Sequence, residues 1–431
     1  MRRITFLFIL LLSMTAAAQH APYFRNALTN MMVYHIEDEF GYNVYEIFKD
    51  LPALEKFDNH DISLRVIDNS KVKNVKGKDS GFHRQQYGGS MVLTNYEKQC
   101  NGQAMLELLN QAQVGKRMVA KWFDLQGRNA QDAHFSTNLI ERRSDYNVSI
   151  EDAEMARYTV EGVNVMQAMS EELIEHSFVL VSDMTYITAE DRAEAAKATL
   201  NVLGGIFDAL TGKNYGERAA QLAGDIADSF TGFKVWTHSY LFQLVWNDSI
   251  ANIFYDKYYT ETPNPERIQA FLADKTSFKL VYLGEESAVY EKTQKKDKYT
   301  RTGLLELITR RSIDNNIAKL QSEYEPFRIK TPISAVEYDN KGKLKGYRAL
   351  VGQKEGVSET RSYEVLETRI EKGKITYKRI ATLKPIANQI WDNRFNALME
   401  NDTDVATEGT LFKLVGSPLK PIMAGMLIRE M

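Results

Sequence analysis

Histidine is the residue that most often ligates metals or moves protons near neutral pH, and the sequence contains seven. No two of them lie at the spacing that metal ligands have on one helix or one hairpin, so we expect no metal site. His238 and Ser239 are neighbours in a predicted strand, where successive side chains point to opposite faces, so they do not form a nucleophile–base pair. The seven are His20, His35, His60, His83, His134, His176 and His238.

Motifs for phosphate binding and for nucleophilic hydrolysis are absent from the sequence. Gly212 and Lys213 are adjacent, but they lack the upstream glycine and the following Ser or Thr of a phosphate-binding loop. The only cysteine, Cys100, has no signature of a catalytic thiol, and we expect it to be a small, partly buried apolar side chain. The sequence therefore predicts no catalytic residue and no cofactor.

One carboxylate and four aromatic side chains remain as candidates for a ligand or partner surface. Asp183 lies in a predicted strand, and ligands of α/β sheets gather towards the carboxyl ends of strands. Trp236, Tyr240 and Trp246 fall in one aromatic strand, and Trp391 follows much later in the chain. Such aromatic residues form the core when they are buried and can stack on sugars or peptides when they are exposed.

The elements that would position these residues form an α/β pattern over 96–326. Helices and strands alternate there, which favours a sheet flanked by helices. The pattern predicts strands over 116–124, 177–187, 233–246 and 278–283, and helices over 97–113, 150–174, 247–259, 267–273 and 304–320.

Two further regions flank this domain, and together with it they predict an α+β fold class. The region 19–95 is expected to be helical over 23–58 and to contain a strand over 61–68. From residue 327 to 431, short alternating runs are separated by glycine-marked turns, which predicts a small antiparallel β-barrel or sandwich.

The segment 190–230 is rich in alanine and glycine. We expect a closely packed helical hairpin that lies on the sheet. The alternative is an amphipathic segment that makes peripheral contact with a membrane or touches a neighbouring subunit. The many charged residues of the segment favour the first interpretation.

The first 18 residues resemble an export signal. Two arginines precede an apolar run over 4–14 that is too short to span a bilayer, and Ala16 and Ala18 give the small-x-small pattern of a cleavage site. No cysteine follows the run, so we expect no lipoprotein. The composition, with 44% hydrophobic and 26% charged residues and a net charge of −3, is that of a globular protein and does not favour nucleic-acid binding.

Two stretches, 173–183 and 232–248, resemble an uncharacterised family of secreted proteins from Bacteroidota, and Lys121-Trp122-Phe123 and Leu139-Ile140-Glu141-Arg142 agree with it. The resemblance covers about residues 115–260. It indicates the source of the protein and implies no mechanism, since that family has no assigned activity. The α/β region is also loosely similar to the curli secretion pore subunit. The stretches 350–356 and 363–365 are similar to small barrel modules of flagellar-assembly proteins. The lipidated cysteine of the pore subunit is missing here.

These features predict an exported cell-envelope protein, in the periplasm or associated with the outer membrane. We expect it to act without catalysis, by contacts with envelope proteins or by self-association. The alternative is a periplasmic hydrolase or carbohydrate-binding protein whose site is assembled from distant residues, with a pocket lined by Asp183 or Trp391 and a carboxylate of shifted pKa.

Overall fold

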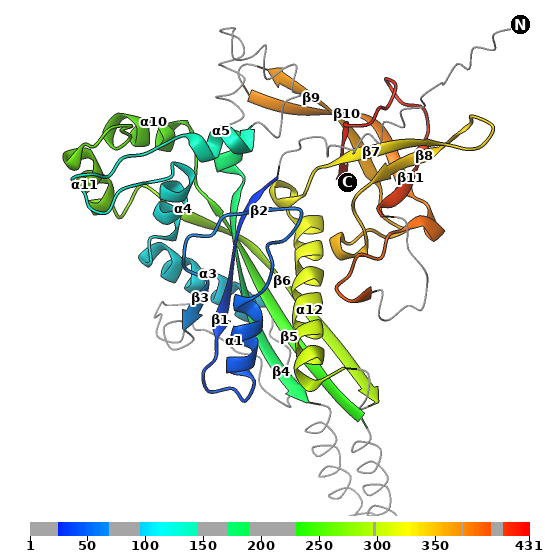
Figure 1. Cartoon of the computed structure of the whole chain (residues 1–431), viewed down its shortest axis with the longest axis horizontal. Helices are drawn as coiled ribbons and strands as arrows, with labels where there is room; N and C mark the ends of the chain where they lie inside the picture. Colours follow the sequence, from blue (N-terminus) through cyan, green and yellow to red (C-terminus); the bar gives the residue numbers. More distant parts are fainter. Residues whose placement is uncertain are drawn as a thin grey trace, which may run out of the picture.

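The computed structural model describes residues 25–68, 95–144, 171–188, 230–295, 299–371, 374–397 and 408–431. It has an α+β fold, in which a sheet flanked by helices is followed by an antiparallel barrel (Figure 1). The expected export signal over 1–18 and nearly all of the Ala/Gly-rich segment 190–230 lie outside the described residues.

The sheet has the strand order β2-β1-β4-β5-β6, and β3 also pairs with β1. The first strand, β1, is parallel to its neighbours, whereas β4, β5 and β6 form antiparallel ladders. The strands are β1 (Ala27–Tyr34), β2 (Asp58–Asn59), β3 (Val66–Asp68), β4 (Ser177–Thr188), β5 (Phe230–Leu244) and β6 (Leu280–Lys295).

Helices cover both faces of this sheet, and each face has its own hydrophobic core. One face packs against α3 (Asn95–Gln111), α4 (Val114–Trp122), α5 (Asn138–Ser144), α10 (Asp248–Lys257) and α11 (Pro265–Ala273). The other face packs against α1 (Gly41–Lys49) and α12 (Arg301–Glu323). Along β4, Val179 and Val181 enter the first core while Phe178 and Leu180 enter the second, which is why the apolar run of this strand is unbroken.

The predicted strands over 177–187 and 233–246 are confirmed as β4 and β5, and the helices predicted over 97–113, 247–259, 267–273 and 304–320 as α3, α10, α11 and α12. The helix expected over 23–58 is wrong for its first part, which forms β1. This strand is covered on both faces, so its apolar residues fill nearly every position and also satisfy a helical spacing.

The strand expected over 116–124 is also wrong, because these residues form α4 and the turn that follows it. The buried residues Val114, Met118 and Trp122 recur at every fourth position, which is the spacing of one helix face. Gly115 lets this helix lie close to the chain leading into β6, since a Cβ there would be 2.8 Å from the carbonyl oxygen of Phe278. Of the strand expected over 61–68, only β3 forms.

The last hundred residues form a closed antiparallel barrel with the strand order β10-β11-β8-β7-β12-β9. The sequence predicts a small antiparallel β-barrel or sandwich here, and this prediction is confirmed. The structure is a barrel. Figure 1 shows α12 running along the sheet and leading to this barrel. Its strands are β7 (Thr331–Tyr338), β8 (Leu344–Ala349), β9 (Tyr363–Glu371), β10 (Lys374–Pro385), β11 (Thr410–Val415) and β12 (Leu427–Glu430).

A layer of polar side chains joins α12 to the centre of the sheet. Asn316 donates hydrogen bonds to the carbonyl oxygen of Thr237 at 2.9 Å and to the hydroxyl of Ser239 at 3.0 Å. The Thr237 hydroxyl donates to Ser312 at 2.8 Å, and the Ser182 and Ser239 hydroxyls are 3.2 Å apart. All five side chains are fully buried, so each lost partner would leave a polar group unsatisfied.

We predict that Asn316→Ala lowers the free energy of unfolding by about 2 kcal/mol, because it leaves Ser239 and the Thr237 carbonyl without their donor. Asn315→Ala is the matched control, since Asn315 is the exposed neighbour on the same helix and its replacement should change stability by less than about 0.5 kcal/mol. Urea unfolding of both variants measures the difference. Equal losses would show that the polar layer does not stabilise the fold.

Candidate functional site

Asp183 lies inside the sheet, on β4 between β1 and β5. Its side chain is 2% exposed, and Oδ1 is 2.5 Å from Nε2 of His35, which follows β1. On β5 its cross-strand neighbour is His238, whose Nδ1 is 2.8 Å from the hydroxyl of Ser287. Burial lowers the pKa of His238 to about 4, so this imidazole is neutral at pH 7.

The four predicted aromatic residues do not form one surface. Tyr240 is fully buried, and its hydroxyl accepts a hydrogen bond from Asn101 on α3 at 3.0 Å. Trp236 is half-buried and lies earlier on β5, with the Lys234 ammonium 4.8 Å from its ring centroid. Trp391 lies beside the barrel, where its backbone bonds to Thr410 and Gln353.

Trp246 is the one predicted residue that lines a large cavity. It follows β5, is 4% exposed, and packs against Phe123 and Phe254 with ring centroids 5.9 Å away in each case. The cavity has a volume of about 500 Å³ and lies where the sheet and the barrel meet.

Segments far apart in the sequence form the walls of this cavity. The sheet side contributes residues just before β4 and residues at the corner between β5 and α10. They are Glu171, Glu172, Glu175 and His176 before β4, and Gln243, Trp246, Asn247 and Asp248 at the corner. Asn247 caps α10 by accepting a hydrogen bond from the backbone N–H of Ile250 at 3.1 Å, which fixes that corner. The barrel side contributes Lys330 just before β7, Tyr377 on β10 and Arg429 on β12.

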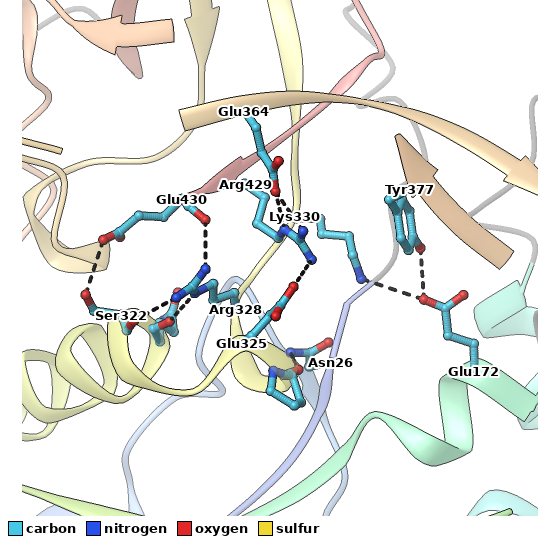
Figure 2. A network of polar contacts seen from close by, with 12 residues as sticks. Asn26, Glu172, Ser322, Glu325, Arg328, Lys330, Glu364, Tyr377, Arg429 and Glu430 are labelled. Carbon is cyan, nitrogen blue, oxygen red and sulfur yellow. Dashed lines mark hydrogen bonds and ion pairs between the residues drawn. The ribbon is translucent and has the colours of Figure 1, made fainter. Parts of the chain in front are cut away.

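Three of these residues form a buried contact between the two sides (Figure 2). The Tyr377 hydroxyl donates to Oε1 of Glu172 at 2.9 Å, and Nζ of Lys330 is 3.7 Å from the same oxygen. The Lys330 ammonium also lies 4.3 Å from the centroid of the Tyr377 ring, a cation–π contact. Lys330 is 5% exposed and Glu172 is 11% exposed.

Burial changes the proton affinity of both charged partners. It raises the pKa of Glu172, and the Lys330 ammonium opposes that rise. It lowers the pKa of Lys330, and the Glu172 carboxylate opposes that fall. Each charge therefore depends on the other, because neither has enough water around it to stay ionised at low cost alone.

A second set of polar contacts lies where the barrel follows α12. Arg429 lies 2.7 Å from Glu364 on β9 and 3.3 Å from Glu325 of η2 (Glu325–Phe327), as Figure 2 shows. Arg328 donates to the carbonyl oxygens of Gln321 and Ser322 at 3.1 and 2.9 Å. From the sheet side, Asn26 donates to the carbonyl oxygen of Phe327 at 3.1 Å.

The described lining of the cavity offers carboxylates, one imidazole and two basic side chains. Its described lining contains no Ser, Thr or Cys that could act as a nucleophile. Burial lowers the pKa of His176 to about 4, and its Nδ1 lies 2.9 Å from the backbone carbonyl of Glu172. Oε1 of Glu172 is already held by Tyr377 and Lys330. Among the described residues, no group of three or more His, Cys, Asp or Glu side chains is arranged to hold a metal ion.

Sequence reasoning missed Glu172, Lys330, Tyr377 and Arg429. They come from four distant segments of the chain. The acidic cluster 171–175 is the one local pattern among them, and it is a weak indication of a site because such clusters usually face solvent.

No known family model matches the chain, and no curated protein is similar to it in sequence. Within the part of the chain that the structure describes, no helix has both the length and the apolar character needed to cross a membrane.

We predict that Lys330→Met lowers the free energy of unfolding by about 3 kcal/mol, because it leaves the Glu172 carboxylate buried without its cation. Adding Glu172→Gln should recover much of that loss, since no unpaired charge remains. Lys345→Met is the control, because Lys345 is 51% exposed and forms a surface ion pair with Glu337, and it should cost less than about 1 kcal/mol. Denaturant unfolding of the four proteins measures these values. A double variant less stable than Lys330→Met alone would contradict this explanation.

Proposed function

We propose that the protein is an exported protein of the cell envelope that acts by binding a partner and not by catalysis. Its location in this proposal is the periplasm or an association with the outer membrane, and its partner is another envelope protein or a second copy of the chain. The binding site in this proposal is the cavity between the sheet and the barrel.

The composition of the cavity carries this proposal. Its polar groups are numerous, and the ones that lie deepest are already bonded to one another: Tyr377 to Glu172, Lys330 to Glu172, and Arg429 to Glu364. In this proposal the paired groups hold the sheet and the barrel together and shape the surface that a partner contacts. Glu175, Asn247 and Asp248 at the rim are exposed, so a partner has access to them.

A periplasmic hydrolase or carbohydrate-binding protein is the second candidate. The raised pKa of Glu172 and the indole of Trp246 in the same cavity favour it, because a carboxyl group of raised pKa is the usual general acid in the hydrolysis of a glycoside. Further carboxyl groups line the same cavity, those of Glu171, Glu175, Asp248 and Glu325. Glu172 itself is held by Lys330 and Tyr377 across the contact between the sheet and the barrel, which favours a structural role for this carboxyl group. Binding is therefore the better supported function.

Site-specific cross-linking in the native cell tests this proposal. We predict that a photo-reactive residue in place of Asn247, at the rim of the cavity, captures a distinct envelope protein or a second copy of the chain. The same residue in place of Lys341, in an exposed turn of the barrel away from the cavity, should not capture it. A full-length chain that retains Met1 in the cytosol would overturn the proposed location. Equal capture from both positions would overturn the proposed binding site.

A further inference from the structure

One end of the barrel exposes several apolar side chains. Because β8 runs antiparallel to both β7 and β11, the end of β7, the start of β8 and the end of β11 lie at the same end of the barrel. Tyr338 is the last residue of β7 and Leu344 the first of β8, and the two are cross-strand neighbours. Val415 is the last residue of β11. These three side chains are 62%, 39% and 42% exposed.

Leu419 belongs to the same group. Its backbone N–H bonds to the carbonyl oxygen of Ile380 on β10 at 2.8 Å, and two residues further along β10 Thr382 pairs with Val415. The side chain of Leu419 is 71% exposed. Single exposed apolar residues are ordinary on a protein surface, but a group on neighbouring strands marks an interaction site. We define the apolar patch as Tyr338, Leu344, Val415 and Leu419.

Lysines lie beside the apolar patch, in the hairpin turn and on the barrel wall. Lys341 and Lys343 are exposed in the turn between β7 and β8. On the wall, Lys384 of β10 and Lys413 of β11 are exposed and directly opposite each other, two residues before Val415. Two like charges paired in this way repel one another, so a negative charge between them is stabilising. Among the described residues, none forms an ion pair with any of these four ammonium groups.

The carboxylates close to the hairpin are fewer and already bonded. Asp339 accepts hydrogen bonds from two backbone N–H groups of its own turn, at 2.8 and 2.9 Å. Glu337 forms ion pairs with Arg348 and Lys345. The sequence over 327–431 contains 18 Lys and Arg and 13 Asp and Glu, although the whole chain has a net charge of −3. The apolar patch therefore lies in a basic surface, which attracts a partner that is both anionic and partly apolar.

The arrangement of these groups suits a plane of negative charge. Figure 1 shows the β7–β8 hairpin projecting from the barrel, and the lysines lie both in its turn and on the barrel wall. A lipid surface with anionic head groups meets charges spread in this way all at once, whereas an extended acidic peptide follows one line across them. The apolar side chains can enter the boundary between head groups and acyl chains, where a tyrosine ring and the stems of lysines are both stable.

We propose that this end of the barrel docks peripherally on an anionic lipid surface, with the apolar patch among the head groups and the lysines on the lipid phosphates. This inference goes beyond the proposed function, which concerns the cavity. The cavity lies beside Lys330 at the start of β7, whereas the apolar patch includes the last residue of the same strand.

Sedimentation of the mature chain with lipid vesicles tests this proposal. One set of vesicles contains phosphatidylglycerol and phosphatidylcholine in equal amounts, and the other contains phosphatidylcholine alone. We expect the chain to bind the anionic vesicles about tenfold more tightly, and salt to weaken this binding. A capped hexapeptide of alternating glutamate and leucine represents an acidic polypeptide partner. Added in excess, it should not displace the chain from the vesicles.

Variants of the opposed lysines locate the contact. Lys384→Gln with Lys413→Gln should weaken binding to the anionic vesicles about tenfold, because it removes two charges that face the head groups. The matched control is Lys257→Gln with Lys275→Gln, at two exposed lysines on and after the helices of the sheet domain. It changes the net charge of the chain by the same amount and should leave the binding unchanged.

Variants of the apolar patch test its insertion. Tyr338→Ser with Leu344→Ser should weaken binding to the anionic vesicles about tenfold, since less apolar surface leaves water. The control is Leu272→Ser with Val289→Ser, at two exposed apolar residues of the sheet domain, and it should have no effect. Circular dichroism of each variant verifies that it is folded.

Equal binding to both kinds of vesicle, or no binding to either, would overturn the proposal. Unchanged binding in the lysine variant would also overturn it and assign the lipid contact to another part of the chain, such as the segment 190–230. Displacement by the acidic peptide would assign this surface to a polypeptide partner instead. Capture from position 247 in the cell reports on the cavity, so the proposed function stands or fails separately from this result.

Discussion

The contact on which the arrangement of this protein depends is the buried pair of Lys330 and Glu172, with the Tyr377 ring and hydroxyl beside it. Glu172 comes from the helical turn that leads into β4, whereas Lys330 and Tyr377 come from the barrel. Removing either charge from water is costly, and the two become stable together only when the barrel sits against this end of the sheet. All three residues also line the cavity, so fold and candidate site share one interaction.

The sequence predicts the elements whose patterns are unambiguous. The unbroken apolar run of β4 and the aromatic β5 indicate strands, and the glycine-marked turns after Phe327 indicate a small β unit. At α4 the strand prediction missed a local signal, because the buried residues of this helix recur at every fourth position. At β1 the helix prediction fails because burial on both faces places apolar residues at spacings that suit either helix or strand. Tertiary packing decides between the two, and a local pattern does not contain that information.

The candidate site is less visible in the sequence than the fold. Trp246 was predicted as part of a ligand or partner surface and does line the cavity, whereas Asp183 and Tyr240 are buried within the sheet and Trp236 and Trp391 lie apart from one another. Glu172, Lys330 and Tyr377 are separated by long stretches of chain, and only the closing of the barrel against the sheet brings them together. Burial shifts the pKa values of Glu172 and Lys330 against their charged forms, and each charged group opposes the shift of the other. Residue types that are ordinary at a surface therefore depend on one another here.

The central claim is that this pair holds the barrel in one position against the sheet. Electron–electron distance measurements between spin labels test it most directly, with one label in place of Asp256 on α10, the other in place of Glu359 on the barrel side, and the buried Cys100 replaced by alanine. The account predicts a single narrow distance distribution in the otherwise native chain. A broad distribution, or several distances, would show that the barrel moves freely and that the cavity between the two units is not a fixed site.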